Sequence, residues 1–383
     1  MPFPSKLPKV GTTIFTVMSA LANEHGAINL SQGFPNFPSS ELLNDLVYRY
    51  LQQGYNQYAP MAGVPLLRQR IAEKAAALYG AALDPETEIT ITAGATQALF
   101  TAISAFIRLG DEVILLEPAY DSYQPAIEVN GGTAVPYRLK PPHYRPDWGE
   151  LETLVTPRTR MIVFNTPHNP TGAVLQAADL QALERLAEAH DLLVLSDEVY
   201  EHLIYDGQAH QSVLRYPGLW QRSLAVYSFG KTFHNTGWKI GYCLAPAHLM
   251  AEFRKVHQFN VFSVNTPMQH ALADYLADAD NYLSLPAFFQ QKRDFFLQAM
   301  HGSPLRPLPC AGTYFCCFDY RAISQEGDLD FARRMTSEYG VAAIPLSAFY
   351  SNGQDDKIIR LCFAKTEETL EEAGERLRKI GTS

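Results

Sequence analysis

Between residues 89 and 245, short apolar runs alternate with helical patterns, and this alternation limits the possible folds most strongly. The runs EITITAG, EVILLEP, RMIVFN, LLVLSDE, SLAVYSF and IGYCLA are almost continuously apolar, which is typical of strands buried on both faces of a sheet. The segments TQALFTAISAFIRLG and DLQALERLAEAH lie between such runs and carry apolar residues at helical spacing. The sequence therefore predicts an α/β fold, with a mostly parallel central sheet sandwiched by helices.

The two ends of the chain have a different pattern. Near the C-terminus, GTYFCCFD and KIIRLCFA are typical of strands, and TEETLEEAGERLRKI is typical of a helix with acids in its first turn and bases in its last. A chain of 383 residues is also too long for one core of about 100–200 residues. We therefore expect a large domain at 46–285 and a smaller α+β domain built from both ends, 1–45 and 286–383.

Composition and charge exclude several classes of protein. Lys and Arg total 31 against 40 Asp and Glu, a formal charge of −9, and no basic run offers a surface for nucleic acid. The five cysteines are odd in number and show no C-x-x-C spacing, so neither a disulfide framework nor a zinc site is indicated. No apolar run approaches the ~18 residues of a membrane helix. We expect a cytoplasmic protein that binds no metal, nucleic acid or membrane.

Familiar nucleotide and hydrolase motifs are missing. The fragment Gly230-Lys231-Thr232 could end a P-loop, but the first glycine of that motif would fall at position 225, which is alanine. No G-x-G-x-x-G follows a predicted strand, and no G-x-S-x-G is present. The lysine must therefore be interpreted in another way.

Lys231 follows the apolar run SLAVYSF, at the end of a predicted strand where ligands bind in open α/β sheets. Ser228 precedes it and Lys239 follows it. A second cation would bind a phosphate and would also lower the pKa of the first amine, which suits a phosphate-bearing carbonyl compound. A solvated lysine in a turn remains the alternative.

Three other places carry polar groups where burial demands a partner. Asp197 ends a buried strand, and it needs a cation or several hydrogen bonds; a helix cap or an ion pair would also satisfy it. Gly94, Ala95 and Thr96 mark a strand-to-helix turn whose free N–H groups could hold a phosphate, although ordinary capped turns are common. Arg360 stands inside an apolar strand, where it requires an anion: a substrate carboxylate or an internal Asp or Glu.

Six blocks of the chain, some of which contain the residues named above, together resemble the ordered motifs of one known family. SFGKTFHNTGWKIGY resembles the lysine signature of class I aminotransferases, which use pyridoxal 5′-phosphate (PLP). SQGFPNFP, NQYAPMAG, NTPHNPTG, SDEVY and IIRLCFAKTEETL resemble the other blocks of that family, over about residues 25–370. The most similar branch comprises the kynurenine aminotransferases (glutamine transaminase K) and bacterial methionine aminotransferases. The resemblance implies a fold-type I PLP-transferase and a homodimer with shared active sites.

The same resemblance implies roles for individual residues around the cofactor ring. Lys231 would bond covalently to PLP and would then shuttle a proton between the substrate and the cofactor. Asp197 would pair with the pyridinium nitrogen and keep the ring electron-poor. Tyr200 and Asn169 would hydrogen-bond the phenolic oxygen, and Tyr120 would stack on the ring.

The phosphate and substrate groups are also assigned by the resemblance. Arg360 would bind the substrate α-carboxylate, assisted by Asn169 and the Gly33 backbone. Lys239 replaces an arginine of the aspartate enzyme and would bind phosphate as a point charge. The implied phosphate ligands are Gly94, Ala95, Thr96, Ser228 and Lys239, with Tyr58 reaching over from the neighbouring subunit.

Two aromatic residues indicate the substrate. Phe15 matches an aromatic pocket wall of the glutamine transaminase K branch, and Phe262 lies in a block that borders the partner's site; aromatic walls favour apolar or soft side chains. No second arginine matches the clamp that aspartate aminotransferases use. We expect transfer of the amino group of a large neutral amino acid to a 2-oxo acid, with methionine favoured, then aromatic amino acids, glutamine or kynurenine.

Three other functions are compatible with parts of this pattern. A cysteine S-conjugate β-lyase would use the same PLP carbanion chemistry on the same fold. A PLP-dependent DNA-binding regulator would need an additional N-terminal domain, which we do not expect because the aminotransferase-like blocks begin by about residue 28. A silent scaffold is disfavoured by the joint presence of Lys231, Asp197 and Arg360.

Overall fold

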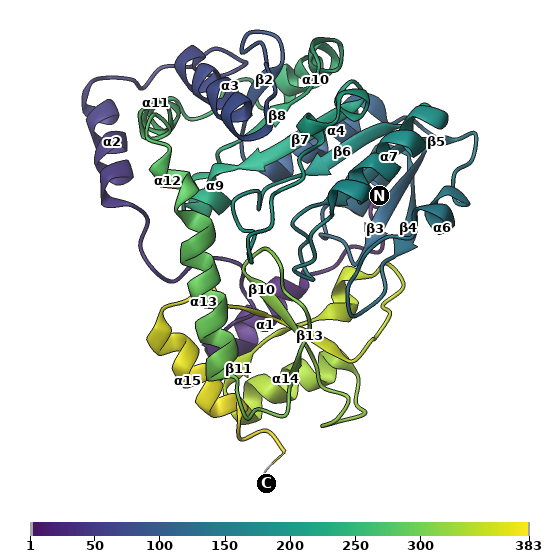
Figure 1. The fold of residues 1–383 in the computed structure, drawn as a ribbon, viewed down its shortest axis with the longest axis vertical. Helices are drawn as coiled ribbons and strands as arrows, with labels where there is room; N and C mark the ends of the chain where they lie inside the picture. The colour runs from purple at the N-terminus through teal and green to yellow at the C-terminus, as the bar shows by residue number, and fades with distance from the viewer. Residues whose placement is uncertain (1–2, 382–383) are drawn as a thin grey trace.

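The computed structural model describes residues 3–381, which form two layers of structure, one above the other in Figure 1. The upper layer contains a seven-stranded sheet in the order β2-β8-β7-β6-β5-β3-β4. All neighbouring strands are parallel except β8, which is antiparallel to both β2 and β7. The strands are β2 (Ile89–Thr92), β3 (Glu112–Glu117), β4 (Thr133–Arg138), β5 (Thr159–Asn165), β6 (Leu193–Asp197), β7 (Ser223–Ser228) and β8 (Gly241–Leu244).

Successive residues of the central strands enter two different cores, which explains the continuous apolar runs. In β3, Val113 and Leu115 pack in one core, and Ile114 and Leu116 pack in the other. The first core also takes residues of α4, α5 and α10, and the second takes residues of α3, α7 and α11. These helices are α3 (Pro65–Tyr79), α4 (Ala95–Phe106), α5 (Tyr123–Val129), α7 (Ala177–Ala189), α10 (Ala247–Asn260) and α11 (Thr266–Tyr275). The predicted mostly parallel sheet, sandwiched by helices, is confirmed.

Strand β4 is the one strand of this sheet that the apolar runs did not predict. It lies at the edge, pairs only with β3, and leaves most of its residues partly or fully exposed. It also contains Pro136, which is tolerated in an edge strand because one side of the backbone needs no partner. An edge strand therefore lacks the continuous apolar run by which its neighbours were found.

The lower layer combines segments from both ends of the chain. A four-stranded antiparallel sheet has the order β12-β13-β10-β9, and β1 pairs with β11 in parallel, so that an N-terminal strand and a C-terminal strand share a ladder. The strands are β1 (Ile28–Asn29), β9 (Arg306–Pro307), β10 (Phe315–Asp319), β11 (Val341–Ala342), β12 (Ile344–Pro345) and β13 (Ile358–Cys362). The helices are α1 (Ile14–Glu24), α13 (Leu285–Ala299), α14 (Asp328–Tyr339) and α15 (Glu367–Leu377).

Helix α13 connects the two layers. Helix α13 runs from the upper layer down into the lower one, where it packs on α15 (Figure 1). The remaining elements are α2 (Glu41–Gln52), α6 (Trp148–Glu152), α8 (Pro217–Trp220), α9 (Phe229–Thr232), α12 (Asp280–Leu283) and the 3₁₀ turns η1 (Val213–Arg215), η2 (Thr236–Trp238) and η3 (Leu346–Phe349). The predicted boundary at residue 45 falls inside α2, and this whole helix packs on α11 of the upper layer. The domain limits stay a prediction.

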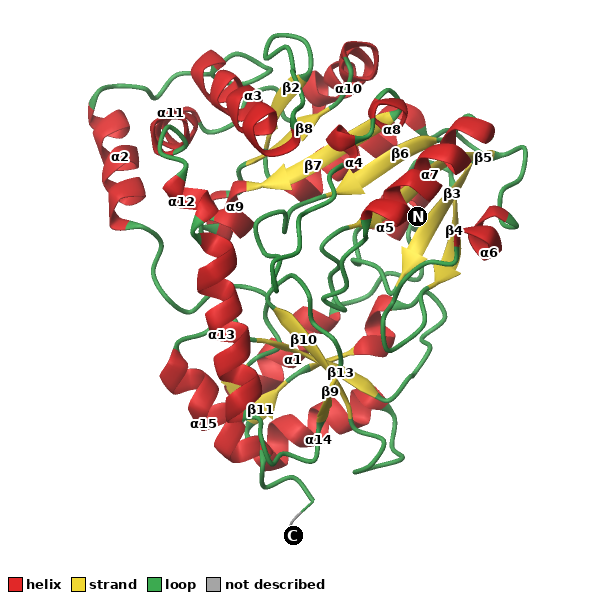
Figure 2. Cartoon of the chain, in the orientation of Figure 1, coloured by secondary structure: helices red, strands yellow, loops and turns green. Residues whose placement is uncertain are grey.

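The carboxyl ends of three neighbouring parallel strands lie side by side. Strands β5, β6 and β7 end at Asn165, Asp197 and Ser228, and they are adjacent in the sheet (Figure 2). Such an edge is where open α/β sheets bind ligands. Over residues 3–381 no helix combines the length and the apolar character needed to cross a membrane.

Candidate active site

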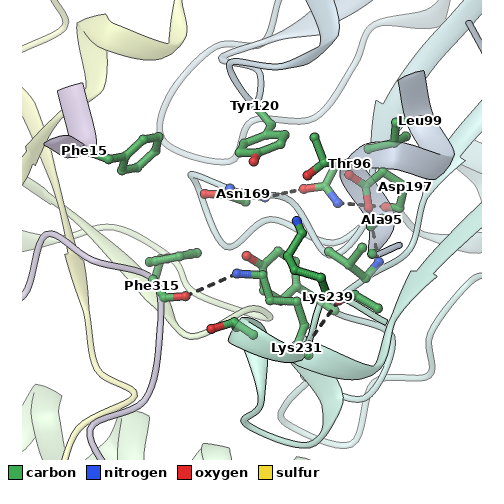
Figure 3. A pocket seen from close by; sticks show the side chains of 18 of the residues that line it. Phe15, Ala95, Thr96, Leu99, Tyr120, Asn169, Asp197, Lys231, Lys239 and Phe315 are labelled. Atoms are coloured by element: carbon green, nitrogen blue, oxygen red, sulfur yellow. Dashed lines mark hydrogen bonds between the residues drawn. The ribbon is translucent and has the colours of Figure 1, made fainter. Parts of the chain in front are cut away.

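A cavity of about 320 Å³ lies where the carboxyl ends of the large sheet meet the N-terminal segment and the strands β10 and β13. In Figure 3, Lys231, Lys239, Tyr120 and Asn169 surround a common space. Every predicted site residue except Tyr58 lines this cavity. The lining residues that the sequence predicted are Gly33, Gly94, Ala95, Thr96, Tyr120, Asn169, Asp197, Tyr200, Ser228, Lys231, Lys239 and Arg360.

Lys231 lies in the short helix α9 that directly follows β7. The Ser228 hydroxyl caps this helix by accepting the Lys231 N–H at 3.4 Å. The Lys231 Nζ donates to the Tyr314 hydroxyl at 3.0 Å and to the Gly33 carbonyl at 3.2 Å. Burial, helped by the nearby Arg360 guanidinium, lowers the pKa of Lys231 to about 8. Lys231 is therefore not a solvated turn lysine, and a neutral amine is within reach near neutral pH.

The carboxylate of Asp197 is buried, with hydrogen bonds but no cation. Its Oδ2 accepts from the Tyr123 hydroxyl at 2.5 Å, and its Oδ1 accepts from the Val199 N–H at 3.3 Å. Burial raises the pKa of Asp197 to about 6. Asn165 braces the strand end by donating to the Asp197 carbonyl at 2.7 Å. The ion-pair alternative is not what the structure contains, and a cationic ligand group would stabilise this carboxylate.

A strand-to-helix turn and a lysine form a cradle for an anion. Gly94 precedes α4 with a φ of 78°, a backbone conformation that favours glycine. A Cβ added at Gly94 would lie 3.3 Å from the Lys239 Nζ, and one added at Gly241 would lie 3.0 Å from the Ala95 nitrogen. Lys239 and Gly241 are thus packed closely against the first turn of α4. Free N–H groups at a helix start, together with an ammonium, suit a phosphate.

Arg360 is almost fully buried, with only 1% of its surface exposed, and none of its hydrogen bonds goes to a carboxylate. Its Nη1 donates to Asn169 Oδ1 at 2.7 Å and its Nη2 to the Ser31 carbonyl at 3.0 Å, whereas Nε has no partner. The guanidinium lies 3.8 Å from the centre of the Phe315 ring and also faces Phe15. A buried cation of this kind calls for an external anion, and a planar carboxylate fits its fork.

Tyrosines form much of the remaining wall. Tyr200 is buried, and burial raises its pKa far above the ordinary value, so that its hydroxyl keeps its proton. Tyr120 meets Tyr123 edge to face, with ring centres 5.8 Å apart. Tyr200 meets Tyr314 edge to face at 5.3 Å. These contacts hold the rings in fixed positions around the cavity.

Among the residues at the site that sequence reasoning missed, Tyr123 and Tyr314 hydrogen-bond two of the predicted charged groups. Tyr123 follows the predicted Tyr120 by three positions, but its bond to Asp197 joins residues 74 positions apart. Tyr314 lies directly before β10 and contacts Lys231 across 83 positions. Neither contact leaves a signal in a single sequence, because a tyrosine at a strand end or helix start is common in a core.

Tyr58 lies away from the cavity of its own chain. Its side chain is 81% exposed and meets Phe262 edge to face at 5.3 Å. Phe262 is itself half exposed, so these two aromatic residues lie together on the surface. Phe15, by contrast, lines the cavity as expected.

With this geometry in place, comparison with known proteins decides the family. Residues 25–377 match the family described as aminotransferase class I and II. The chain belongs to this family. It is an aminotransferase, and the predicted fold class, with a mostly parallel sheet sandwiched by helices, is shared by its solved relatives.

Individual relatives cover the chain almost completely. The methionine aminotransferase of Escherichia coli is 54% identical over 98% of both chains. The human kynurenine–oxoglutarate transaminase 1 is 35% identical, with 94% of this aminotransferase and 93% of the human enzyme covered. A crystal structure from E. coli, described as having a methionine aminotransferase function, superposes with a TM-score of 0.97 at 54% identity, over 99% of this chain and 100% of that one. The predicted branch of the family is confirmed.

Proposed function

We propose that this aminotransferase uses PLP and transfers the amino group of a large neutral amino acid, methionine first, to a 2-oxo acid. One observation carries the proposal. A single cavity contains an amine of lowered pKa on Lys231, a carboxylate without a cation on Asp197, and a guanidinium without a carboxylate on Arg360. These three groups match the aldehyde and the pyridinium nitrogen of PLP and the α-carboxylate of an amino acid.

The residues present fit PLP by their own chemistry. Lys231 would hold it covalently, Asp197 would bind its ring nitrogen, and Tyr200 and Asn169 would donate to its phenolic oxygen. Tyr120 would cover the ring face. PLP, when bound, supplies an electron sink for the negative charge that develops at the substrate Cα. Its phosphate would lie in the cradle, on Gly94, Ala95, Thr96, Ser228 and Lys239.

Arg360 orients the amino acid. Its guanidinium is desolvated, already held by Asn169 and the Ser31 carbonyl, and pressed against Phe315. A substrate carboxylate therefore meets a cation that needs little reorganisation, and the Gly33 backbone lies close to the same place. Because every α-amino acid carries this carboxylate, Arg360 reads the shared part of all donors.

Lys231 moves the proton. With a pKa of about 8, its free amine would take up the proton released from the substrate Cα and would deliver it to the product. Asp197, whose carboxylate is already hydrogen-bonded by Tyr123, would hold the protonated ring nitrogen of PLP. Lys231 would thus serve the proton transfer, and Asp197 would keep the ring able to accept electrons.

The composition of the wall supports a soft, neutral substrate side chain. Phe15, Tyr120 and Phe315 present aromatic surfaces to the cavity. Within the described part of the chain, the cationic lining residues are Lys231, Lys239 and Arg360, and each already has a role. No further cation is present there for a second carboxylate. A methionine thioether is well suited to aromatic walls, and the E. coli relative carries the name of that activity.

A homodimer would complete the site. Tyr58 and Phe262 form an exposed aromatic pair, and Phe259 nearby is 87% exposed. Large exposed rings of this kind mark an interface more often than a free surface. We infer that this face meets a second copy and that Tyr58 reaches the phosphate of the partner subunit.

Mixing two defective variants tests the shared site. Lys231→Ala removes the amine of one chain, and Tyr58→Ala removes the phosphate contact that we assign to the other. In a hybrid dimer, one site carries both defects and the other carries none. We expect mixed subunits to recover about a quarter of the wild-type activity per site, from random pairing. If Tyr58 served its own chain, no activity would return.

A cytoplasmic location is consistent with the cysteines. All five are free, and four of them are buried. Cysteines that remain unpaired are typical of a reducing compartment.

A donor panel tests the reaction itself. The PLP-loaded protein would be mixed with single donors, methionine, phenylalanine, glutamine, kynurenine or aspartate, and the change of the cofactor absorption would be followed without an acceptor. We expect methionine to react fastest and aspartate slowest. Release of thiol from a cysteine S-conjugate faster than conversion of methionine would instead favour the β-lyase activity. A protein that acquires no visible absorption from PLP would overturn the proposal.

A further inference from the structure

Tyr314 lies where three separate parts of the chain meet. Its hydroxyl donates to the Gly33 carbonyl at 2.6 Å, and it accepts from the Lys231 Nζ at 3.0 Å. The Lys231 Nζ also donates to the same Gly33 carbonyl, at 3.2 Å. The amine, the phenol and the carbonyl therefore form a closed triangle of hydrogen bonds, contributed by α9, by the residue before β10 and by the N-terminal segment.

The direction of these bonds follows from the chemistry of the three groups. A carbonyl can only accept, so the single proton of the Tyr314 hydroxyl points to Gly33. The phenol oxygen can therefore offer only lone pairs to Lys231. A neutral amine has two N–H bonds and one lone pair, and the two acceptors take up both N–H bonds. The lone pair is left in the direction away from Tyr314 and Gly33.

The phenol is held rigidly in this position. Tyr314 is fully buried, and its own carbonyl accepts the Phe363 N–H at 2.9 Å. The preceding residue, Thr313, has a φ of 64° and donates its N–H to the Leu203 carbonyl at 2.9 Å. The ring is packed edge to face against Phe315, with centres 4.8 Å apart. The hydroxyl therefore has little freedom except rotation about its own bond.

The carbonyl side of the triangle is fixed in the same way. A Cβ added at Gly33 would lie 2.6 Å from the Phe315 ring and 3.6 Å from the Tyr314 ring. Only a residue without a side chain can approach the two rings this closely. The Gly33 carbonyl is thus brought within reach of both the phenol and the amine.

We propose that Tyr314 is a positioning residue for Lys231: together with the Gly33 carbonyl, it holds the free amine by both N–H bonds, so that the lone pair is directed to the substrate Cα. This inference rests on the proposed function of Lys231 as the base. The amine takes up the Cα proton as a third N–H bond and becomes an ammonium ion, while Tyr314 keeps its own proton throughout. Returning that proton to the product restores the triangle.

Two consequences separate this role from simple packing. Loss of the phenol oxygen removes an acceptor that stabilises the ammonium form more than the neutral amine, so the pKa of Lys231 must fall. Loss of the orienting contact must also slow proton transfer, whereas the carboxylate contact through Arg360 remains. The expected change is a lower kcat at an almost unchanged KM.

The variant Tyr314→Phe tests both consequences, with Tyr320→Phe as the matched control. Tyr320 is also fully buried and also loses one hydroxyl bond, to the Glu326 carbonyl, but it does not touch Lys231. In the cofactor-free proteins, labelling of Lys231 by reductive methylation would be followed against pH by mass spectrometry. We expect the labelling midpoint to fall by about one pH unit in Tyr314→Phe and to stay in place in Tyr320→Phe.

The loaded enzymes supply the second measurement. With methionine deuterated at Cα, we expect kcat of Tyr314→Phe to fall at least about tenfold and its isotope effect on kcat to rise, with KM within about twofold of the wild type. An unchanged labelling midpoint would overturn the inference, as would a loss of kcat without a larger isotope effect. The wild-type protein is assayed in parallel. If it converts methionine while Tyr314→Phe behaves like the wild type, the inference about Tyr314 fails and the proposed function stands.

If Tyr314→Phe does not fold, Tyr314→fluorotyrosine keeps the shape of the residue. The fluorinated phenol is a weaker acceptor, so the labelling midpoint of Lys231 should fall in the same direction by a smaller amount. A midpoint that does not move would overturn the inference with the fold intact.

Discussion

The protein contains two groups of buried charged residues, one that includes Asp197 and one that includes the neighbouring Glu198. The two groups differ in the partners that their charges have. In the active site, Asp197 accepts only neutral donors and Arg360 has no hydrogen-bonded carboxylate. In the second group, Glu201 pairs with Lys74 inside the protein. In the first group neither charge has a counter-charge within hydrogen-bond distance, whereas in the second the Lys74 ammonium neutralises the Glu201 carboxylate.

In the second group, the carboxylates accept hydrogen bonds from several side chains of the protein. The Glu198 carboxylate accepts from His210 and Tyr227, both at 2.8 Å. The Glu201 carboxylate accepts from Lys74 and from the hydroxyl of Tyr79. These residues tie α3 to the segments that follow β6 and to β7. Internal pairing of this kind supports the geometry of the strand ends rather than chemistry at the cavity.

The pKa values show the same contrast. For Asp197, burial raises the pKa to about 6, because the hydrogen bonds from Tyr123 and Val199 and the more distant Lys231 ammonium offset the loss of solvent only in part. For Glu201, burial alone would raise the pKa, but the Lys74 ammonium outweighs it and lowers the pKa to about 2. Two carboxylates four positions apart are therefore shifted in opposite directions. The difference teaches that an unpaired buried charge, rather than burial itself, identifies the functional group.

The largest effect is expected from Lys231→Ala. Removal of the amine would abolish the proposed covalent link to PLP and the proposed base, so kcat should fall by at least about 10⁴-fold and the visible absorption of the lysine-bound cofactor should disappear. The free energy of unfolding of the cofactor-free protein should not fall, because the amine is desolvated there without a counter-charge. Absorption spectra, steady-state kinetics and urea unfolding check this. A substantial residual turnover would remove Lys231 from the centre of the mechanism.

The second largest effect is expected from Lys74→Met, which breaks the ion pair between Lys74 and Glu201. The change leaves the Glu201 carboxylate buried without its cation, which should lower the free energy of unfolding by about 3–5 kcal/mol. Folded protein should keep its KM for methionine. Urea unfolding at pH 7 measures the loss, and the double variant Lys74→Met/Glu201→Met should recover part of it. If the single variant were as stable as the wild type, the two groups would not differ as described.

The same kind of substitution in the active site should act differently. Arg360→Met should raise KM for every amino donor by about 100-fold, because it removes the contact with the shared carboxylate. Its free energy of unfolding should fall by less than about 1 kcal/mol, since no internal carboxylate loses a partner. Kinetics with methionine and phenylalanine, together with urea unfolding, measure both effects. A variant that impaired one donor and spared the other would show that Arg360 does not bind the common carboxylate.

The smallest effect concerns pH. Because the pKa of Asp197 is about 6 in the folded protein and near its ordinary value of 3.8 when unfolded, the folded state binds more protons between these values. Wild-type stability should therefore fall relative to Asp197→Asn as the pH rises from about 4 to 6, by about 2–3 kcal/mol in total. Unfolding of both cofactor-free proteins across this range tests the sign. A difference that is independent of pH would contradict the raised pKa.

The central sheet could be predicted because its residues carry a local signal. Val113 to Leu116 are apolar at every position since both faces of β3 are covered, and the same holds for the neighbouring strands. The edge strand β4 lacks that signal, as Pro136 and its exposed neighbours show. The predicted site residues were found through residue types at strand ends and through family motifs, and all but Tyr58 line one cavity.

The sequence by itself determined the residues to which we assign the chemistry: a lysine after one strand, an acid at the end of another and an arginine within a third. Only the tertiary structure decided that Arg360 meets Ser31, 329 positions away, instead of a carboxylate, and that Tyr123 and Tyr314 reach Asp197 and Lys231. The physical reason is that residue type and local spacing are properties of a segment, whereas pairing depends on distances between segments that only folding brings together.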